Sequence, residues 1–273
     1  SRYQVAAETD GNLRQEIMKL KKSLGFSLVV ALAALASCAK LREKPVVDFV
    51  MQDFKAESAP NCREDSACAT FQVQYPEFLG VDTTVGKSIA NRVVNHFSNA
   101  IAVDASAQPG SLQQLGNDFV KDFKDFTSEE PGYDLGWYFR GQVTVLISSD
   151  TLISLQVDSE TFTGGAHANY STNFVNIEPK NGTEFLLDQM LRPGYRDDLN
   201  RLAAEELERQ LQLNQTDSLE STGFDDGTFE FNNNYGFRKE GIVFYFDVSE
   251  FGSPVDDPVE IIIPYEKLRG WMK

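Results

Sequence analysis

Apolar residues recur along this chain at two spacings, and each spacing predicts a different kind of element. In the middle of the chain two apolar runs, 143–147 and 152–157, flank the turn-forming residues Ser148–Thr151, which predicts a β-hairpin. The pair Gly164 and Gly165 follows, and glycine readily adopts the positive φ that a tight reversal requires. We therefore expect strands on both sides of this reversal, in a mostly antiparallel sheet.

Apolar residues spaced three and four apart predict helices in other stretches. The first helix has Ile89, Val93 and Phe97 on one side, with Thr83 and Thr84 placed to cap its start. The predicted helices are Val85–Val103, Ser111–Phe126 and Tyr195–Leu213. Further strands are predicted at Val46–Phe54, Ala69–Tyr75, Tyr133–Ile147, Tyr170–Ile177, Thr228–Phe231, Gly236–Val248 and Val259–Ile263. Together these elements predict an α+β fold, with helices packed on a mostly antiparallel sheet.

The charge of the chain narrows the range of partners. Its 273 residues carry 25 Lys and Arg against 41 Asp and Glu, a formal net charge of −16, with a pI of about 4.5. Such a surface repels phosphate, so nucleic acid is not expected as a partner, and a cationic protein is favoured instead. The length allows one large domain or two small ones, each with its own core.

The start of the chain has the layout of an export signal that ends at a cysteine. A basic stretch precedes an apolar run from Leu24 to Ala36, which is too short for a comfortable membrane span. The run leads into Leu35-Ala36-Ser37-Cys38, which resembles a bacterial lipobox, so we expect a lipid on Cys38. A signal anchor, or an ordinary cleaved signal with an incidental cysteine, stays open as the alternative.

The lipobox divides the first 45 residues. Residues 1–37 are predicted to be an upstream extension and a lipoprotein signal peptide, with Met18 as the natural start. Residues 38–45 would then tether the fold to the membrane. No acidic residue lies next to Cys38, which by resemblance to lipoproteins of diderm bacteria favours the outer membrane, facing the periplasm.

The other two cysteines are close together in the sequence. Cys62 and Cys68 are separated by five residues, and disulfides persist in exported proteins. We therefore predict a local disulfide between them. A zinc site is the poorer interpretation, because two thiols without a nearby second pair of ligands do not complete a tetrahedral set.

The sequence holds little material for catalysis. Its two histidines, His96 and His167, stand in no recognisable nucleophile context, so a Ser-His-Asp triad is not expected. We interpret His96 as a packed residue, and His167 as a ring that fixes the Gly-Gly turn or reaches a ligand from it. The pairs Asp225-Asp226 and Asp256-Asp257 offer loose calcium ligands but lack the spacing of a calcium loop. We predict no cofactor and no resident metal.

Six short motifs identify a family resemblance. They are Gly164-Gly165-Ala166-His167, Asn173–Ile177, Asn181-Gly182-Thr183, Leu187–Tyr195, Gly241–Phe246 and Glu260–Leu268. In combination they resemble the extracytoplasmic domain of unknown function shared by RsiV-type anti-sigma factors, which sense lysozyme, and PdaC-type peptidoglycan deacetylases. The resemblance implies two halves, a PdaC-like domain at 46–178 and an RsiV-like domain at 179–273. The deacetylases owe their activity to a separate metal-binding domain that has no counterpart in these residues, so no enzymatic activity is expected.

The function that we expect is non-catalytic binding at the cell envelope. The partner would be a cationic protein such as lysozyme, as the resemblance implies and as opposite charge favours, or a cell-wall glycan such as peptidoglycan fragments. The candidate binding residues combine acidic loops, aromatic anchors and one histidine: Asp225, Asp226, Asp256, Asp257, Tyr245, Phe251 and His167. Two alternatives stay open, namely an envelope hydrolase that uses an unrecognised carboxylate pair on glycans, and a structural envelope protein.

Overall fold

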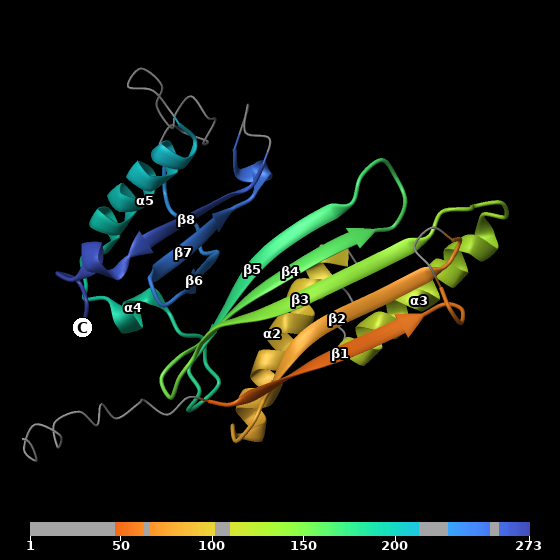
Figure 1. The fold of residues 1–273 in the computed structure, drawn as a ribbon, viewed down its shortest axis with the longest axis horizontal. Helices are drawn as coiled ribbons and strands as arrows, with labels where there is room; N and C mark the ends of the chain where they lie inside the picture. Colours follow the sequence, from red (N-terminus) through yellow and green to blue (C-terminus); the bar gives the residue numbers. More distant parts are fainter. Residues whose placement is uncertain (1–46, 63–65, 102–109, 213–228, 252–256) are drawn as a thin grey trace, which may run out of the picture. The chain divides into compact units, whose positions relative to one another are not determined.

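A five-stranded sheet with two helices on one face forms the N-terminal half of the structure (Figure 1). The computed structural model describes residues 47–62, 66–101, 110–212, 229–251 and 257–273. Sequence order is also the order across the sheet, with β1 (Phe49–Glu57), β2 (Ala69–Phe78), β3 (Trp137–Ser148), β4 (Ile153–Phe162) and β5 (Asn169–Ile177). Between β2 and β3 the chain forms α2 (Thr83–Ile101) and α3 (Leu112–Glu129).

One strand pair departs from the antiparallel pattern. The pairs β1–β2, β3–β4 and β4–β5 are antiparallel, whereas β2 and β3 run parallel, with Ala69 opposite Trp137. Parallel neighbours need a long crossover connection, and α2 and α3 supply it. The α+β fold predicted from the sequence is confirmed, and this mixed pairing is the feature that the prediction lacked.

The two helices pack on the sheet through aromatic side chains. Phe71 of β2 and Phe139 of β3 are fully buried and stack with ring centroids 4.7 Å apart. Phe97 of α2 and Phe119 of α3 lie 5.3 and 6.5 Å from the Phe139 ring. Because side chains alternate along a strand, the neighbours of these core residues point away from the helices and leave the opposite face of the sheet uncovered by them.

The C-terminal half contains a second, smaller sheet of three strands. Its strands are β6 (Tyr235–Phe237), β7 (Gly241–Phe246) and β8 (Val259–Pro264), all antiparallel. Its helices are α4 (Leu187–Met190), α5 (Arg196–Gln210) and the short 3₁₀ turns η3 (Val248–Glu250) and η4 (Tyr265–Leu268). Leu199 and Leu207 of α5 are fully buried in one cluster with Phe244 and Ile263 of the sheet. These two halves correspond to the two that the resemblance implied.

Buried hydrogen bonds join the halves where β6 meets β4 and β5. The Ser154 hydroxyl donates to Asn176 Oδ1 at 2.7 Å and accepts from the Phe237 N–H at 2.9 Å. The Asn176 amide donates to the Tyr235 carbonyl at 2.7 Å. Since Ser154 and Asn176 are both buried, each finds its partners only in this arrangement. These buried hydrogen bonds therefore fix how β6 lies against the larger sheet.

The start of α2 corrects one detail of the prediction. Asp82, not Thr83 or Thr84, caps the helix, because its Oδ1 accepts from the Thr84 N–H at 2.7 Å. That hydrogen bond lowers the pKa of Asp82, since it stabilises the carboxylate. The helices predicted at Val85–Val103, Ser111–Phe126 and Tyr195–Leu213 otherwise correspond to α2, α3 and α5, with ends shifted by a few residues.

Two predicted strands near the C-terminus are wrong. Residues 229–231 form no strand; Phe229 is buried instead, with its ring 5.7 Å from that of Phe246. The predicted strand Gly236–Val248 is a hairpin, in which β6 and β7 are joined by a turn that the Arg238 N–H closes on the Gly241 carbonyl. The charged triplet Arg238-Lys239-Glu240 marks this reversal, but it contains no Pro-Gly or Asn-Gly pair, and the prediction passed over it.

The predicted lipid site and signal lie outside the part of the chain that the structure describes, as Cys38 and residues 1–46 are not among its described residues. Among the described helices, none is long and apolar enough to cross a bilayer.

Candidate functional site

The binding residues predicted from the sequence do not gather on one described surface. Asp225, Asp226 and Asp256 lie outside the described residues. Asp257 is exposed before β8, and His167 is exposed in the turn between β4 and β5. That turn does use positive φ at its two glycines, 98° at Gly164 and 104° at Gly165, as predicted.

The two predicted aromatic anchors differ in their accessibility. Tyr245 on β7 is half-buried, and burial raises the pKa of its hydroxyl. Phe251 is only 5% exposed, and its ring centroid lies 6.3 Å from that of Phe246. Phe251 is therefore a core residue, which corrects its assignment to an exposed contact surface.

The remaining predictions on single residues concern the cysteines and His96. Cys62 and Cys68 form the predicted disulfide, with Cα atoms 5.9 Å apart, in the connection between β1 and β2. His96 is half-buried on α2, where burial and the nearby Arg92 lower the pKa of its imidazole. His96 is therefore a partly packed histidine, as the sequence indicated.

A polar surface that the sequence analysis did not single out lies across the five-stranded sheet, on the face turned away from α2 and α3. Strand register places its side chains in neighbouring rows, such as Lys55–Gln72–Arg140–Glu160–Tyr170. We call this surface the open sheet face, and define it by Asp53, Lys55, Gln72, Gln74, Tyr138, Arg140, Gln142, Asp158, Glu160, Tyr170 and Thr172. All of these residues are exposed or half-buried.

Glu160 is the centre of the first hydrogen-bond network on this face. Its carboxylate accepts from Arg140 Nη1 at 2.7 Å, from the Tyr138 hydroxyl at 2.9 Å and from the Tyr170 hydroxyl at 3.3 Å. Desolvation raises the pKa of Glu160, but the hydrogen bonds from Arg140 and Tyr138 outweigh it, so the pKa is lowered. Burial and the bond to Glu160 raise the pKa of Tyr138 to about 12. The guanidinium of Arg140 also lies 4.6 Å from the Tyr138 ring centroid.

Side-chain amides form a second network beside the first. Gln142 Nε2 donates to Gln74 Oε1, and Gln74 Nε2 donates to Asp53 Oδ1, both at 3.1 Å. Together with Lys55 and Arg140, these side chains border a shallow hollow of about 320 Å³ over β1, β2 and β3. The chain of amides leaves further donor and acceptor positions directed towards solvent.

A third network connects the open sheet face to the C-terminal half. Asp158 accepts from the Thr172 hydroxyl at 2.7 Å and from Gln156 Nε2 at 3.0 Å. Arg238 donates to Gln156 Oε1 at 3.0 Å and holds Glu260 through two bonds of 2.6 and 2.7 Å. Such a bidentate Arg–carboxylate pair is geometrically specific, so it fixes this end of the face.

The described residues offer no assembled metal site or evident catalytic pair. No group of three or more His, Cys, Asp or Glu side chains among them could hold a metal ion. A general acid on a glycan would need a raised pKa, whereas the pKa of Glu160 is lowered by its partners. The open sheet face offers hydrogen-bonding side chains and aromatic rings that can take part in recognition.

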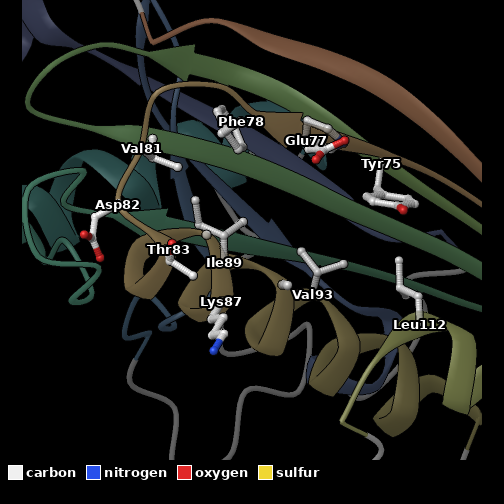
Figure 2. Close-up of a pocket in the computed structure, with 13 residues that line it drawn as sticks. Tyr75, Glu77, Phe78, Val81, Asp82, Thr83, Lys87, Ile89, Val93 and Leu112 are labelled. Carbon is white, nitrogen blue, oxygen red and sulfur yellow. The ribbon is translucent and has the colours of Figure 1, made fainter.

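A second hollow lies on the helical side of the sheet and has a different character. It measures about 460 Å³ and lies between the end of β2, α2 and the start of α3. In Figure 2, Ile89 and Val93 point from α2 towards the strand, with Phe78, Val81 and Leu112 around them, whereas Lys87 points away. Its centre is thus apolar.

One feature of the sequence could have predicted the open sheet face, but the prediction did not use it. Polar residues alternate with core residues at Gln72-Phe71, Arg140-Phe139 and Asp158-Val157, which is also the pattern of any solvated sheet face. Only the order β1-β2-β3-β4-β5 brings these separate alternations side by side, and the parallel pairing of β2 with β3 was not predicted.

Two family models match separate parts of this chain. The model described as deacetylase PdaC matches residues 62–170, and the model described as protein of unknown function DUF3298 matches residues 188–266. The first match lies in the half with the larger sheet, and the second in the half with the smaller one. No curated protein matches the chain.

Solved structures share the fold of both halves together. A DUF3298 family protein from Pseudomonas aeruginosa PAO1 superposes with a TM-score of 0.62 at 18% identity, covering 84% of this chain and 96% of that one. A DUF3298 family member from Bacteroides fragilis NCTC 9343 gives a TM-score of 0.59 at 20% identity, with the same two coverages. At this identity the likeness concerns the fold alone.

Proposed function

From the premise that the chain carries a PdaC-like domain followed by a DUF3298 domain, we propose that it is a non-catalytic binding protein of the cell envelope. Its ligand is a cell-wall glycan, bound on the open sheet face. The proposal places the protein outside the cytoplasm through the export signal and lipid site that the sequence predicts at Cys38.

The observation that carries the glycan proposal is the hydrogen-bonded order of the open sheet face. Gln74, Gln142 and Asp53 hold one another in place, so a ligand would meet groups that are already oriented. Amide side chains offer both donors and acceptors, which suits the hydroxyl and acetamido groups of cell-wall sugars. Tyr170 is 67% exposed and adds an aromatic ring that can pack against a sugar face.

The balance of charge on the open sheet face also suits a neutral or weakly charged ligand. Its members include two cations, Lys55 and Arg140, and three anions, Asp53, Asp158 and Glu160. A surface that bound a cationic protein tightly would be expected to carry a clear excess of acids. The open sheet face therefore favours the glycan over lysozyme as its own ligand.

A cationic protein remains the second candidate partner because of the charge outside this face. The first 46 residues hold eight of the 25 Lys and Arg and four of the 41 Asp and Glu, which leaves a net charge of −20 on residues 47–273. Such a field accelerates association with a basic protein such as lysozyme and makes the affinity depend on salt. The acidic pairs predicted from the sequence would take part in this second mode.

Titration against both ligands separates the two candidates. The chain from residue 39 onward is titrated with solubilised peptidoglycan fragments and with lysozyme, each at two salt concentrations. Glycan binding that depends little on salt, and that weakens about tenfold when Gln74→Ala and Gln142→Ala are combined, supports the proposal. The control is Gln113→Ala on α3, which is exposed but lies away from the open sheet face.

Other outcomes would redirect the proposal. Binding of lysozyme alone, weakened by salt and unaffected by the two glutamine changes, would support the second candidate. A change in the mass of the glycan would show catalysis and contradict a purely binding function. The absence of binding to either ligand would overturn both candidates.

A further inference from the structure

Exposed apolar side chains are concentrated at one end of the larger sheet. Seven large apolar side chains are exposed in the described part of the chain, and four of them lie at this end. These four, which we call the apolar rim, are Phe49 (37% exposed), Val50 (47%), Met51 (37%) and Leu79 (49%). Exposed apolar groups that gather at one place mark interaction surfaces more often than scattered ones do.

The members of the apolar rim lie at the adjoining ends of β1 and β2, with Val50 on the opposite face of the sheet from Phe49 and Met51, because side chains alternate along a strand. Phe49 pairs with Phe78 across β1 and β2, and their ring centroids are 5.7 Å apart. The Leu79 N–H donates to the Asp48 carbonyl at 2.7 Å, which holds Leu79 beside the start of β1. Phe78, the partner of Phe49, also lines the apolar hollow between β2 and α2 (Figure 2).

The rim lies where the described chain begins. The Ser148 hydroxyl donates to the carbonyl of Val47, the first described residue, and β1 starts two residues later (Figure 1). Eight residues, 39–46, separate Val47 from Cys38, so nine peptide units join the two and an extended chain reaches at most about 32 Å. A lipid on Cys38 would therefore hold the start of β1 within about that distance of the bilayer.

The distribution of polar residues along β1 argues against a second copy of the chain as the occupant. A copy that paired with this edge strand would run along the whole of β1, yet Asp53, Lys55 and Glu57 place charges on its remainder. The apolar character is confined to the first three residues of the strand. A shallow insertion at one end fits this pattern better than strand pairing does.

We propose that the apolar rim inserts into the surface of a lipid bilayer, so that the domain docks on the membrane. This inference rests on the proposed location at the cell envelope, but not on the glycan ligand. The net charge of −20 on residues 47–273 opposes approach to anionic lipid, so the matching surface is one rich in zwitterionic headgroups. The contact adds a second attachment beside a lipid on Cys38.

Vesicle binding of the unlipidated chain tests the proposal directly. Residues 45–273 form a compact unit of their own, so the chain from residue 39 onward can be used without the lipid. It is mixed with phosphatidylcholine vesicles, with and without phosphatidylglycerol, and the bound fraction is measured by flotation. We expect binding to phosphatidylcholine that weakens when phosphatidylglycerol is added, because like charges then repel.

Two variants locate the contact. Combining Phe49→Ser, Val50→Ser, Met51→Ser and Leu79→Ser should reduce the partition coefficient at least about tenfold, because four partly exposed apolar groups no longer leave water. Leu79→Ser alone should reduce the partition coefficient severalfold. Because Leu79 is not part of a strand, this single variant remains informative if the quadruple variant does not fold. The matched control combines Leu135→Ser with Leu186→Ser, two leucines that are each 45% exposed elsewhere on the surface.

Three results would overturn the proposal: no binding of the parent chain to either vesicle, equal loss in the control variant, or a concentration-dependent dimer that the rim variant abolishes. The peptidoglycan titration of the rim variant should equal that of the parent. A failure of vesicle binding therefore leaves the glycan proposal intact, and a failure of glycan binding leaves the membrane contact intact.

Discussion

Single residues explain how closely α2 can approach the larger sheet. Gly141 lies in β3, and a Cβ added there would be 2.8 Å from Phe97 Cζ and 3.0 Å from Val73 Cγ2. Both neighbours are buried core side chains, so neither can move aside without disturbing the packing. The absence of a side chain at this position is therefore a condition for the contact between helix and sheet.

Replacing this glycine should destabilise the protein. Gly141→Ala is expected to lower the free energy of unfolding by about 1–3 kcal/mol, because the added methyl group overpacks the core. Denaturant unfolding measures the change. Gly270→Ala is the matched control, since a Cβ there meets no atom within 4 Å, and its effect should be close to zero. Equal effects of the two changes would contradict this account of the core.

The ion pair of Glu160 with Arg140 predicts a pH dependence. The pKa of Glu160 in the folded protein is lowered from 4.5, so its ionised form stabilises the fold. That contribution is fully present above the unfolded value and is lost as the pH falls through the lower folded value. The difference in unfolding free energy between the parent and Glu160→Gln should thus be largest above pH 4.5 and narrow below it. A difference that stays constant with pH would show that ionisation of Glu160 does not matter.

Some helices and strands could be predicted from the sequence more easily than others. The helices and the hairpin at Ser148–Thr151 were predictable because each carries its own spacing and its own turn residues. The hairpin of β6 and β7 was not predicted, because its turn, Arg238-Lys239-Glu240-Gly241, has none of the usual turn dipeptides. Gly241 is required there by a close approach, since a Cβ would lie 2.3 Å from the Ile263 carbonyl oxygen. Local patterns also cannot specify which strands become neighbours, so the parallel pair β2–β3 required the structure.

The connection between β1 and β2 carries the disulfide, and its contribution can be predicted from the short loop that it closes. Cys62 and Cys68 are six positions apart, so the bond restricts only a small part of the unfolded chain. Replacing both by serine should reduce the free energy of unfolding by about 2 kcal/mol, in the lower half of the usual range. Chemical denaturation of the oxidised parent and the double variant measures this, and a loss of more than about 4 kcal/mol would show that the loop has a larger structural role.

At the scale of the whole molecule, the candidate site results from the assembly of five strands. Residues that are far apart in sequence, such as Asp53, Gln74 and Gln142, become hydrogen-bonded neighbours only in the folded sheet. Acidic loops were predicted as contacts instead, since charge can be recognised in a sequence without knowledge of the fold. The predicted partner class and location follow from sequence and resemblance, whereas the surface proposed here for the glycan follows from topology.

The most direct test of the central claim is to observe which side-chain amides respond to the glycan. We would record the side-chain amide NMR signals of the chain from residue 39 onward while adding solubilised peptidoglycan fragments. We expect saturable shifts for Gln72, Gln74 and Gln142 on the open sheet face, and none for Gln113 on α3. Shifts confined to Gln113 or to residues away from β1–β5, or no saturable shift at all, would contradict glycan binding on this face.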